Sequence, residues 1–231
     1  MAPAEKKVII SIQQVSKSYQ QGKVKVNAVN DLSLDIEEGE FTALCGPSGS
    51  GKTTLLNMIG GLDLPTEGVI KLELQELAQL SRMALSHLRR DRIGFVFQAY
   101  NLIPVMTAYE NAEFVLALQG MPKAQRRERV MSILKQVGLQ GLESRRPDEM
   151  SGGQQQRVAI ARAIVTHPAV VLADEPTANV DSENAEALLD LMEELNQREG
   201  ITFIFSTHDP RVMKRARRLV YLRDGQLDPA A

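Results

Sequence analysis

A run of glycines followed by lysine and threonine gives this sequence a phosphate-binding pattern. The run reads GPSGSGKT and occupies residues 46–53. Glycines let successive backbone N–H groups turn inward around an anion, and a helix that starts here adds the positive end of its dipole. Lys52 can reach the β- and γ-phosphates of a nucleotide, and the Thr53 hydroxyl can ligate Mg²⁺. The residues predicted to contact the nucleotide are Gly46, Pro47, Ser48, Gly49, Ser50, Gly51, Lys52, Thr53 and Thr54.

Two adjacent carboxylates, Asp174 and Glu175, follow the short apolar run of residues 169–173. A run that is apolar throughout is typical of an interior parallel strand, and ligands bind at the carboxyl edge of such sheets. Asp174 is suited to bind Mg²⁺ through its water shell, and Glu175 to polarise an attacking water molecule. The alternative is an exposed pair that caps a helix, which the phosphate-binding pattern upstream disfavours.

Two further patterns could bring polar groups to a phosphate. His208 follows the apolar run of residues 201–206, so parallel packing would place it near Glu175, where it could hold the γ-phosphate and the attacking water. The SGG at residues 151–153 precedes a helical pattern and could form a second anion-binding helix start. Taken alone, that stretch could equally be a polar helix cap.

Alternating strand and helix patterns predict an α/β fold that positions these groups. Phe41–Cys45 is typical of a buried strand entering the phosphate loop, and helix-prone residues follow the loop. Residues 8–15, 28–36 and 69–72 predict further strands in a small antiparallel sheet beside the loop, with Tyr19 in a polar loop. The alternation indicates a doubly wound core with a mostly parallel sheet.

Strand patterns give way to helical periodicity over residues 99–156, most clearly over residues 128–137. The remaining predicted elements are helical pieces at 77–90, a strand at 93–97, a helix between Asp181 and Gly200, and a hairpin at 219–227. We therefore expect a single domain over residues 1–231. Its α/β core with the β subdomain would span residues 1–98 and 157–231, and a helical subdomain residues 99–156.

The composition of the chain limits its possible partners and cellular location. The 231-residue chain is 43% hydrophobic and carries a net charge of −2, so it has no global positive field and no nucleic acid partner is expected. Its one cysteine, Cys45, ends a predicted strand, which suits a small buried side chain better than a reactive thiol. No apolar run approaches about 18 residues and no charged-then-apolar leader opens the chain, so a cytoplasmic protein is expected.

A sequence between the phosphate loop and Asp174 points to one family. Residues 150–157 read MSGGQQQR, which resembles the LSGGQ signature of ATP-binding cassette ATPases, with Met150 in place of leucine. The resemblance implies a P-loop NTPase core of the RecA-like type, an antiparallel β subdomain and an inserted α-helical subdomain. It also implies ATP as the nucleotide and Mg²⁺ as the cofactor.

Four more motifs follow in the order of that family. Gln98 resembles the glutamine of the Q-loop, residues 178–181 (ANVD) resemble the D-loop, and His208 resembles the switch histidine. Tyr19 resembles the aromatic residue that stacks on adenine, although such a residue is as often a packing residue. The resemblance covers essentially the whole chain, and the sequence is identified as a member of this family.

The resemblance implies a homodimer with ATP held between the phosphate loop of one subunit and the signature of the other. Ser151 and Gly153 would close on the γ-phosphate held by the other subunit's Lys52. Across this interface the expected nucleotide contacts are Ser151, Gly152, Gly153, Gln154 and Asp181. The expected catalytic residues are Glu175, His208 and Gln98, and the expected Mg²⁺ ligands are Thr53, Gln98 and Asp174. Glu175 is the stronger candidate for general base, and the relative weight of His208 is left open.

The segment from Gln98 to Glu113 is expected to dock an integral membrane permease. It contains Tyr100, Leu102, Ile103, Val105 and Met106, which would form an exposed apolar cluster. This segment and the strings THDPRV and LRDGQL resemble the ATPases of the lipoprotein-releasing and macrolide-exporter group. The resemblance implies a subunit that energises a separate permease from the cytoplasmic face of the inner membrane.

Two alternatives stay open. The chain could serve another ABC system, such as an importer or a cell-division-associated one, because similar strings occur there. It could also be a soluble ABC ATPase acting on DNA or ribosomes. The DNA-repair members of that class insert long coiled coils and the translation members carry two cassettes, and this sequence has neither.

Overall fold

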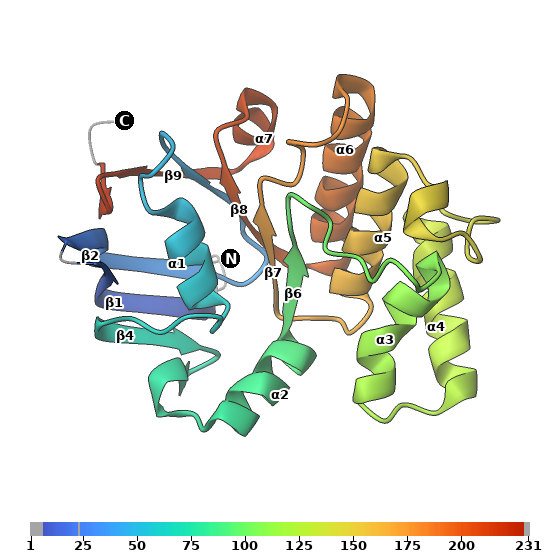
Figure 1. Ribbon diagram of the computed structural model, residues 1–231, viewed down its shortest axis with the longest axis horizontal. Coiled ribbons are helices and arrows are strands. Elements are labelled where there is room, and N and C mark those ends of the chain that lie inside the picture. The colour runs from blue at the N-terminus through green and yellow to red at the C-terminus, as the bar shows by residue number, and fades with distance from the viewer. Residues whose placement is uncertain (1–6, 23, 229–231) are drawn as a thin grey trace, which may run out of the picture.

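The computed structural model describes residues 7–22 and 24–228, which form two β-sheets and the helices around them (Figure 1). The larger sheet has the strand order β10-β9-β3-β8-β7-β6, in which only the β9–β10 pair is antiparallel among the described strands. Its strands are β3 (Phe41–Cys45), β6 (Ile93–Val96), β7 (Val170–Asp174), β8 (Thr202–Thr207), β9 (Arg218–Arg223) and β10 (Gln226–Leu227). The carboxyl ends of the parallel strands therefore lie along one edge.

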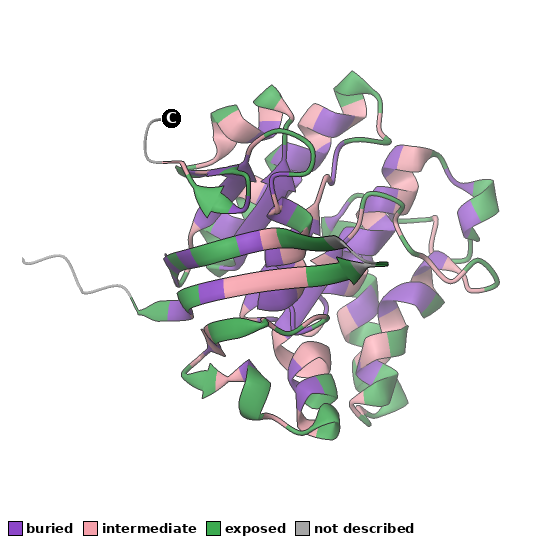
Figure 2. Cartoon of the chain, turned by 60° about the vertical axis from the view of Figure 1, so that its left-hand side comes forward, coloured by how far each residue is buried: buried purple, intermediate pink, exposed green. Residues whose placement is uncertain are grey.

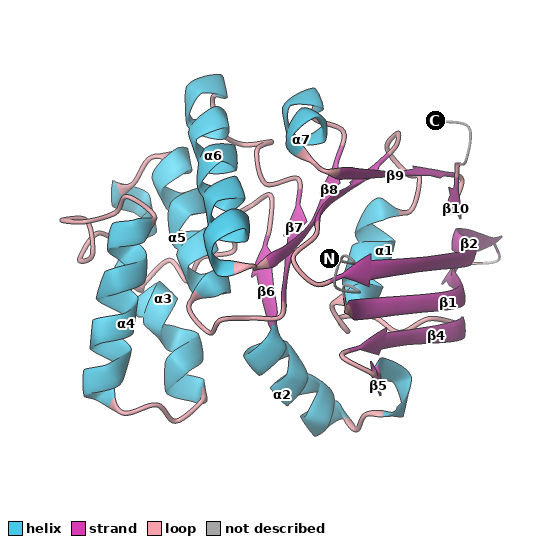
Figure 3. Cartoon of the chain, turned by 180° about the vertical axis from the view of Figure 1, so that it is seen from behind, coloured by secondary structure: helices cyan, strands magenta, loops and turns pink. Residues whose placement is uncertain are grey.

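Helices cover both faces of this sheet, as its continuous apolar strands predict. The helices are α1 (Lys52–Ile59), α2 (Arg82–Arg92), α3 (Ala108–Leu118), α4 (Lys123–Gln136), α5 (Gly152–Ile164), α6 (Ser182–Glu199) and α7 (Pro210–Arg215). Alternate strand residues face opposite sides: Ala173 packs into one core with α5 and α6, and Leu172 into the other with α1. Figure 3 shows α3 to α6 gathered to one side of the strands and the smaller sheet on the other.

The smaller sheet is antiparallel, with the order β2-β1-β4-β5. Its strands are β1 (Val8–Gln21), β2 (Val24–Glu37), β4 (Glu67–Leu72) and β5 (Gln75–Glu76). The predicted antiparallel sheet is confirmed. The prediction of a polar loop around Tyr19 is wrong, because Tyr19 lies on β1 opposite Val26. Polar residues continue the strand here because the β2 backbone satisfies their hydrogen bonds. Figure 2 shows exposed and buried residues mixed along these outer strands, in front of the buried inner sheet.

Several predicted elements have the expected places. The strand at Phe41–Cys45 and the helix between Asp181 and Gly200 are confirmed, the latter as α6 with Asp181 as N-cap and Gly200 as C-cap. Helix α7 was not predicted. The division proposed at residue 156 falls inside α5, which continues without a break from the helical region into the core against the sheet. Across residues 7–22 and 24–228, no helix is long and apolar enough to span a bilayer.

Candidate functional site

The phosphate loop joins β3 to α1 at the carboxyl edge of the larger sheet. Gly46 and Gly51 have φ angles of 146° and 101°, a region that favours glycine. A Cβ on Gly46 would lie 2.2 Å from the Leu222 carbonyl oxygen, and one on Gly51 would lie 2.4 Å from that of Ala28. The loop needs glycine at both positions because the backbones of β9 and β2 approach it so closely.

Lys52 begins α1, and its side chain folds back over the loop. Its Nζ donates hydrogen bonds of 2.8 Å to the carbonyl oxygens of Gly46 and Pro47, and the residue is only 7% exposed. The ammonium is thus held at the mouth of the loop, where phosphate oxygens can replace the carbonyls as stronger acceptors. Cys45 lies buried at the end of β3, and burial raises the pKa of its thiol to about 11. The prediction that Cys45 is buried is therefore confirmed.

Thr53 and Asp174 supply hard oxygen ligands where α1 meets β7. The Thr53 hydroxyl donates to Asp174 Oδ1 at 3.1 Å, and such oxygens fit Mg²⁺. In the described part of the chain no cluster of three or more histidine, cysteine or acidic residues could hold a metal ion alone. An Mg²⁺ ion here would therefore take its other ligands from phosphate and water. Ser50 Oγ is buried without a partner among the described residues, which also fits a bound phosphate.

Glu175 and His208 come together just beyond the ends of β7 and β8. Glu175 Oε1 lies 2.6 Å from His208 Nδ1, and the Thr207 hydroxyl donates to Glu175 Oε2 at 3.2 Å. Glu175 has a φ of 45°, a conformation that costs free energy in a non-glycine residue. Its side chain is 15% exposed, against 74% for His208. The carboxylate is thus fixed from the sheet side while the imidazole reaches solvent.

One cleft of about 530 Å³ brings these groups together. Its lining residues are Ala28, Pro47, Ser48, Gly49, Gly51, Lys52, Thr53, Thr54, Gln98, Glu175, Ala178 and His208. Gln98 enters from the end of β6, and Asp174 touches the cleft through its bond to Thr53. The predicted catalytic residues and all of the predicted phosphate-loop residues except Gly46 and Ser50 therefore line a single cavity at the sheet edge.

Tyr19 lies beside this cleft on β1. Its hydroxyl donates to Asp63 Oδ2 at 2.8 Å and also contacts the Thr54 side chain at the start of α1. Burial, and then the hydrogen bond to Asp63, raises the pKa of the Tyr19 hydroxyl. Lys17 also binds Asp63, and its Nζ lies 5.1 Å from the centre of the tyrosine ring. These contacts hold the ring in place, and the residue as a whole is 39% exposed, so part of it is open to a ligand.

The signature residues sit apart from the cleft, at the start of α5. Ser151 is the N-cap: its hydroxyl accepts from the Gln154 N–H, and the Ser151 N–H donates to Gln154 Oε1. Figure 1 shows α5 on one side of β6, β7 and β8 and α1 on the other. Residues 151–153 are not among the described residues that line the cleft. Asp181 caps α6, and a hydrogen bond from the Asn184 side chain lowers its pKa.

Three residues connect the motifs through hydrogen bonds, a role that the sequence did not predict for them. The Tyr100 hydroxyl donates to the Asn179 carbonyl at 2.8 Å, and the Asn179 amide donates to the Gln98 carbonyl at 2.9 Å. Gln156, from α5, donates to the Pro176 carbonyl at 2.6 Å. Gln156 and Asn179 lie within motifs already singled out, so asking which buried polar side chain each motif contributes could have found them.

Comparisons with known proteins agree with this geometry. The profile of the family described as ABC transporter matches residues 29–178. The uncharacterised ABC transporter ATP-binding protein YvrO of Bacillus subtilis is 45% identical over 219 residues, covering 95% of each chain. A protein of the same description from Methanocaldococcus jannaschii, MJ0796, is 43% identical, again covering 95% of each.

Solved structures match over the same length. A dimeric structure of the ATP-binding cassette MJ0796 in a post-hydrolysis state with ADP and Pi has a TM-score of 0.89 and 42% identity, covering 95% of this chain and 97% of that one. A structure of cbiO1 from Clostridium perfringens, part of the transporter complex cbiONQ, has a TM-score of 0.86 and 30% identity, covering 96% and 87%.

Proposed function

The chain belongs to the ABC transporter family and is an ATPase of that family, and on this premise we propose that it powers a separate membrane permease. The permease would be of the lipoprotein-release or macrolide-export type, and the chain would act from the cytoplasmic face of the membrane. The observation that carries the proposal is the division of the site: the cleft holds the phosphate loop and the catalytic pair, while the signature lies outside it.

The lining of the cleft supports the following proposed roles for the predicted residues. The amides of the phosphate loop and Lys52 would bind the β- and γ-phosphates, and Tyr19 would lie under the adenine ring. When Mg²⁺ is bound by Thr53, Asp174 and Gln98, its charge neutralises phosphate oxygens during hydrolysis. The fit of an Mg²⁺ ion rests on the Thr53–Asp174 oxygen pair.

Glu175 is the proposed general base. Its Oε1 would take the proton of the attacking water, and the Thr207 hydroxyl bond would hold the other carboxylate oxygen. His208 Nδ1 fixes the orientation of the carboxylate through the 2.6 Å contact. With a hydrogen on both ring nitrogens, the exposed His208 ring would donate to Glu175 from Nδ1 and to a γ-phosphate oxygen from its other nitrogen.

A second copy of the chain would complete the site. In that arrangement Ser151, Gly152, Gly153 and Gln154 of one subunit, with Asp181, close on the ATP held by the other subunit's loop, so ATP stabilises the dimer. The dimeric MJ0796 structures support this proposal by analogy. The two-fold arrangement makes two equivalent sites.

Mixing two inactive variants tests the shared site. Lys52→Ala removes the ammonium, and Ser151→Glu places a carboxylate against the γ-phosphate at a helix start that tolerates negative charge. Each variant alone should lose hydrolysis. A mixture contains heterodimers in which one site has both an intact loop and an intact signature, so activity should return to about a quarter of wild type. A mixture as inactive as its components would show that the sites are not shared between subunits.

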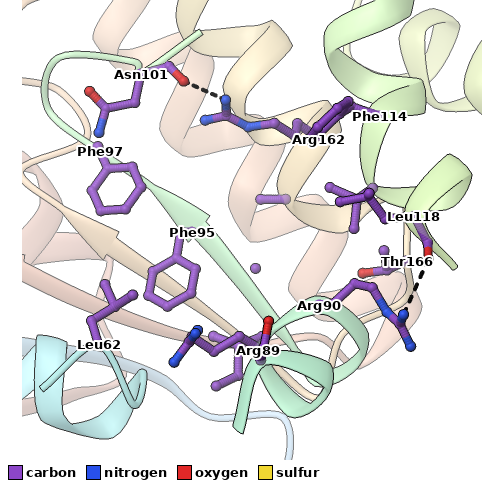
Figure 4. A pocket seen from close by; sticks show the side chains of 15 residues that line it. Leu62, Arg89, Arg90, Phe95, Phe97, Asn101, Phe114, Leu118, Arg162 and Thr166 are labelled. Carbon is purple, nitrogen blue, oxygen red and sulfur yellow. Dashed lines mark hydrogen bonds between the residues drawn. The ribbon is translucent and has the colours of Figure 1, made fainter. Parts of the chain in front are cut away.

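An apolar groove of about 410 Å³ supports the permease as partner (Figure 4). Phe95 and Phe97 of the β6 region face Phe114 and Leu118 of α3 across it, and Leu62 adds to the β6 side. These side chains come from separate elements, and the groove lies between the core and the helical region. Its size and apolar lining suit one face of an amphipathic helix.

Positive charge at the rim of the groove defines the partner further. Arg89 and Arg162 donate to backbone carbonyls, of Gly61 and of Tyr100 and Asn101 respectively. Neither arginine forms an ion pair with an acidic side chain within residues 7–22 and 24–228, so their positive charges are available to a partner. A cytoplasmic permease helix with carboxylates beside its apolar face would match this surface.

The predicted docking segment contributes less to the groove than expected. Val105 is 74% exposed, but Tyr100, Leu102, Ile103 and Met106 are half-buried, and Leu102 packs against the core. The predicted exposed cluster is therefore wrong for four of its five residues and confirmed for Val105. Hydrogen bonds explain the difference, because Asn111 of α3 accepts from the Ile103 N–H and Arg162 of α5 donates to the backbone carbonyls of this segment. Asn101 and the nearby Phe97 and Phe114 keep the proposed docking site next to this segment.

Cross-linking tests the groove. The chain has a single cysteine, the buried Cys45, so Leu118→Cys introduces a reactive thiol at the groove and Leu74→Cys one at an exposed turn of the smaller sheet. In membranes, Leu118→Cys should cross-link to a cytoplasmic loop of a protein with several spanning helices, identified by peptide mapping, and Leu74→Cys should not. Equal cross-linking from both positions, or none from Leu118→Cys, would contradict docking in the groove.

A further inference from the structure

A buried hydroxyl ties the turn that carries Glu175 to the turn that carries His208. Thr177 is two residues beyond Glu175, is 1% exposed, and donates to Asp209 Oδ2 at 2.8 Å. Asp209 directly follows His208. A side-chain bond therefore closes the gap between two turns whose strands, β7 and β8, already run side by side.

Asp209 is itself firmly held. Oδ1 accepts from the Arg211 backbone N–H at 2.9 Å, and Oδ2 accepts from Arg211 Nη2 at 2.7 Å. Its own N–H donates to the Thr207 hydroxyl oxygen at 2.9 Å. Although burial opposes ionisation, the hydrogen bonds from Arg211 and Thr177 lower the pKa of Asp209 to about 2. The carboxylate is thus a fixed, charged acceptor for the Thr177 hydroxyl.

The Glu175 turn depends on such outside contacts. With a φ of 45°, Glu175 is in a conformation that persists only where its surroundings impose it. Its N–H donates to the Ser206 carbonyl at 2.9 Å, and Gln156 holds the next carbonyl, that of Pro176. Thr177 supplies a further contact, which joins the turn to Asp209 on the far side of His208 and adds to the direct contacts of Glu175 with Thr207 and His208.

We propose that Thr177 and Asp209 are positioning residues for ATP hydrolysis, because their hydrogen bond sets the position of the Glu175 carboxylate relative to His208. The inference rests on the role proposed for Glu175. Neither residue is among those that line the cleft, so their effect would pass through the geometry of Glu175. A displacement of about 1 Å at a reacting group can lower turnover on the order of 10²-fold.

Three variants of the full chain test the bond. Thr177→Val removes the hydroxyl at nearly constant volume and leaves Asp209 paired with Arg211. We expect kcat for ATP to fall about 10- to 100-fold with KM changed less than about twofold. Thr177→Ser restores the hydroxyl and should recover most of kcat. Thr202→Val is the matched control, since Thr202 is equally buried and its hydroxyl accepts from the Gly39 N–H at the opposite edge of the sheet.

The controls separate positioning from simple loss of stability. Thr202→Val should lower the melting temperature about as much as Thr177→Val while kcat stays at the wild-type value. A kcat for Thr177→Val equal to wild type, or a loss in Thr202→Val as large as that in Thr177→Val, would overturn the proposal. Glu175→Gln is measured alongside. If Glu175→Gln also hydrolyses ATP at the wild-type rate, the proposed role of Glu175 fails first.

Discussion

The starts of α1 and α5 carry similar sequences but are built differently. Helix α1 begins after Gly51, which has no side chain to cap it, so its first amides stay open toward the cleft. Helix α5 begins after Ser151, which forms a reciprocal capping box with Gln154. Elements of the same chain complete the cleft around α1, whereas at the start of α5 the capping box ties only Ser151 and Gln154 to each other. One phosphate-binding surface is thus complete within the chain, and the other is the one that we propose a second copy of the chain would use.

The largest effect on ATP binding should come from removing the Lys52 ammonium from the phosphate loop. Lys52→Ala would remove the two charge-assisted hydrogen bonds proposed between Lys52 and the β- and γ-phosphates. Because each such bond contributes about 1.5–3 kcal/mol, ATP affinity should fall about 10³-fold. Titration calorimetry or fluorescent nucleotide binding measures this. Lys71→Ala, at a half-buried lysine of β4, is the control and should bind ATP normally. Unchanged affinity of Lys52→Ala would refute the role of the loop.

Removing the base should separate binding from hydrolysis. Glu175→Gln keeps the shape of the side chain but cannot accept the water proton, so kcat should fall about 10²- to 10³-fold while ATP affinity stays within about twofold. Because ATP is retained, the proposed dimer should persist in gel filtration with ATP and Mg²⁺. A monomer that hydrolyses ATP at the wild-type rate would refute both the role of Glu175 as general base and the proposal that a second copy completes the site.

Some of this site could be predicted from the sequence because its parts are contiguous. The loop, the Asp174–Glu175 pair and the SGG turn each occupy a few consecutive residues next to an apolar strand or a periodic helix. The groove could not be predicted, since Leu62, Phe97 and Phe114 meet only through tertiary packing. Tertiary pairing also explains the wrong loop at Tyr19, whose polar neighbours become strand through contact with β2.

Helix α7 and the Thr177–Asp209 hydrogen bond were not predicted from the sequence, and the reasons differ. Helix α7 is six residues long, too short for periodicity, although Asp209 followed by Pro210 is a helix-start signal that was present. The bond to Thr177 joins residues 32 positions apart. Parallel pairing of β7 and β8 indicates that the two turns are close, but not which side chains meet.

A smaller effect is expected at the signature, because its hydroxyl is one of several donors. Ser151→Ala should lower kcat about 10-fold and destabilise the chain by about 1 kcal/mol through loss of the cap. Ser81→Ala removes the matching cap of α2, where the hydroxyl accepts from the Ala84 N–H. It should cost similar stability with normal kcat. Equal kcat in the two variants would mean that Ser151 only caps a helix.

The smallest effect should come from Tyr19, which extends the cleft from the smaller sheet. If its ring stacks on adenine, Tyr19→Ala should weaken ATP binding about 5-fold, since such contacts contribute on the order of 1 kcal/mol. Tyr19→Phe keeps the ring but loses the bond to Asp63, and should bind ATP almost normally. Inorganic tripolyphosphate lacks the base, so its binding should be the same in both variants. If Tyr19→Phe weakens ATP binding as much as Tyr19→Ala, the hydroxyl bond that positions α1 matters and stacking does not.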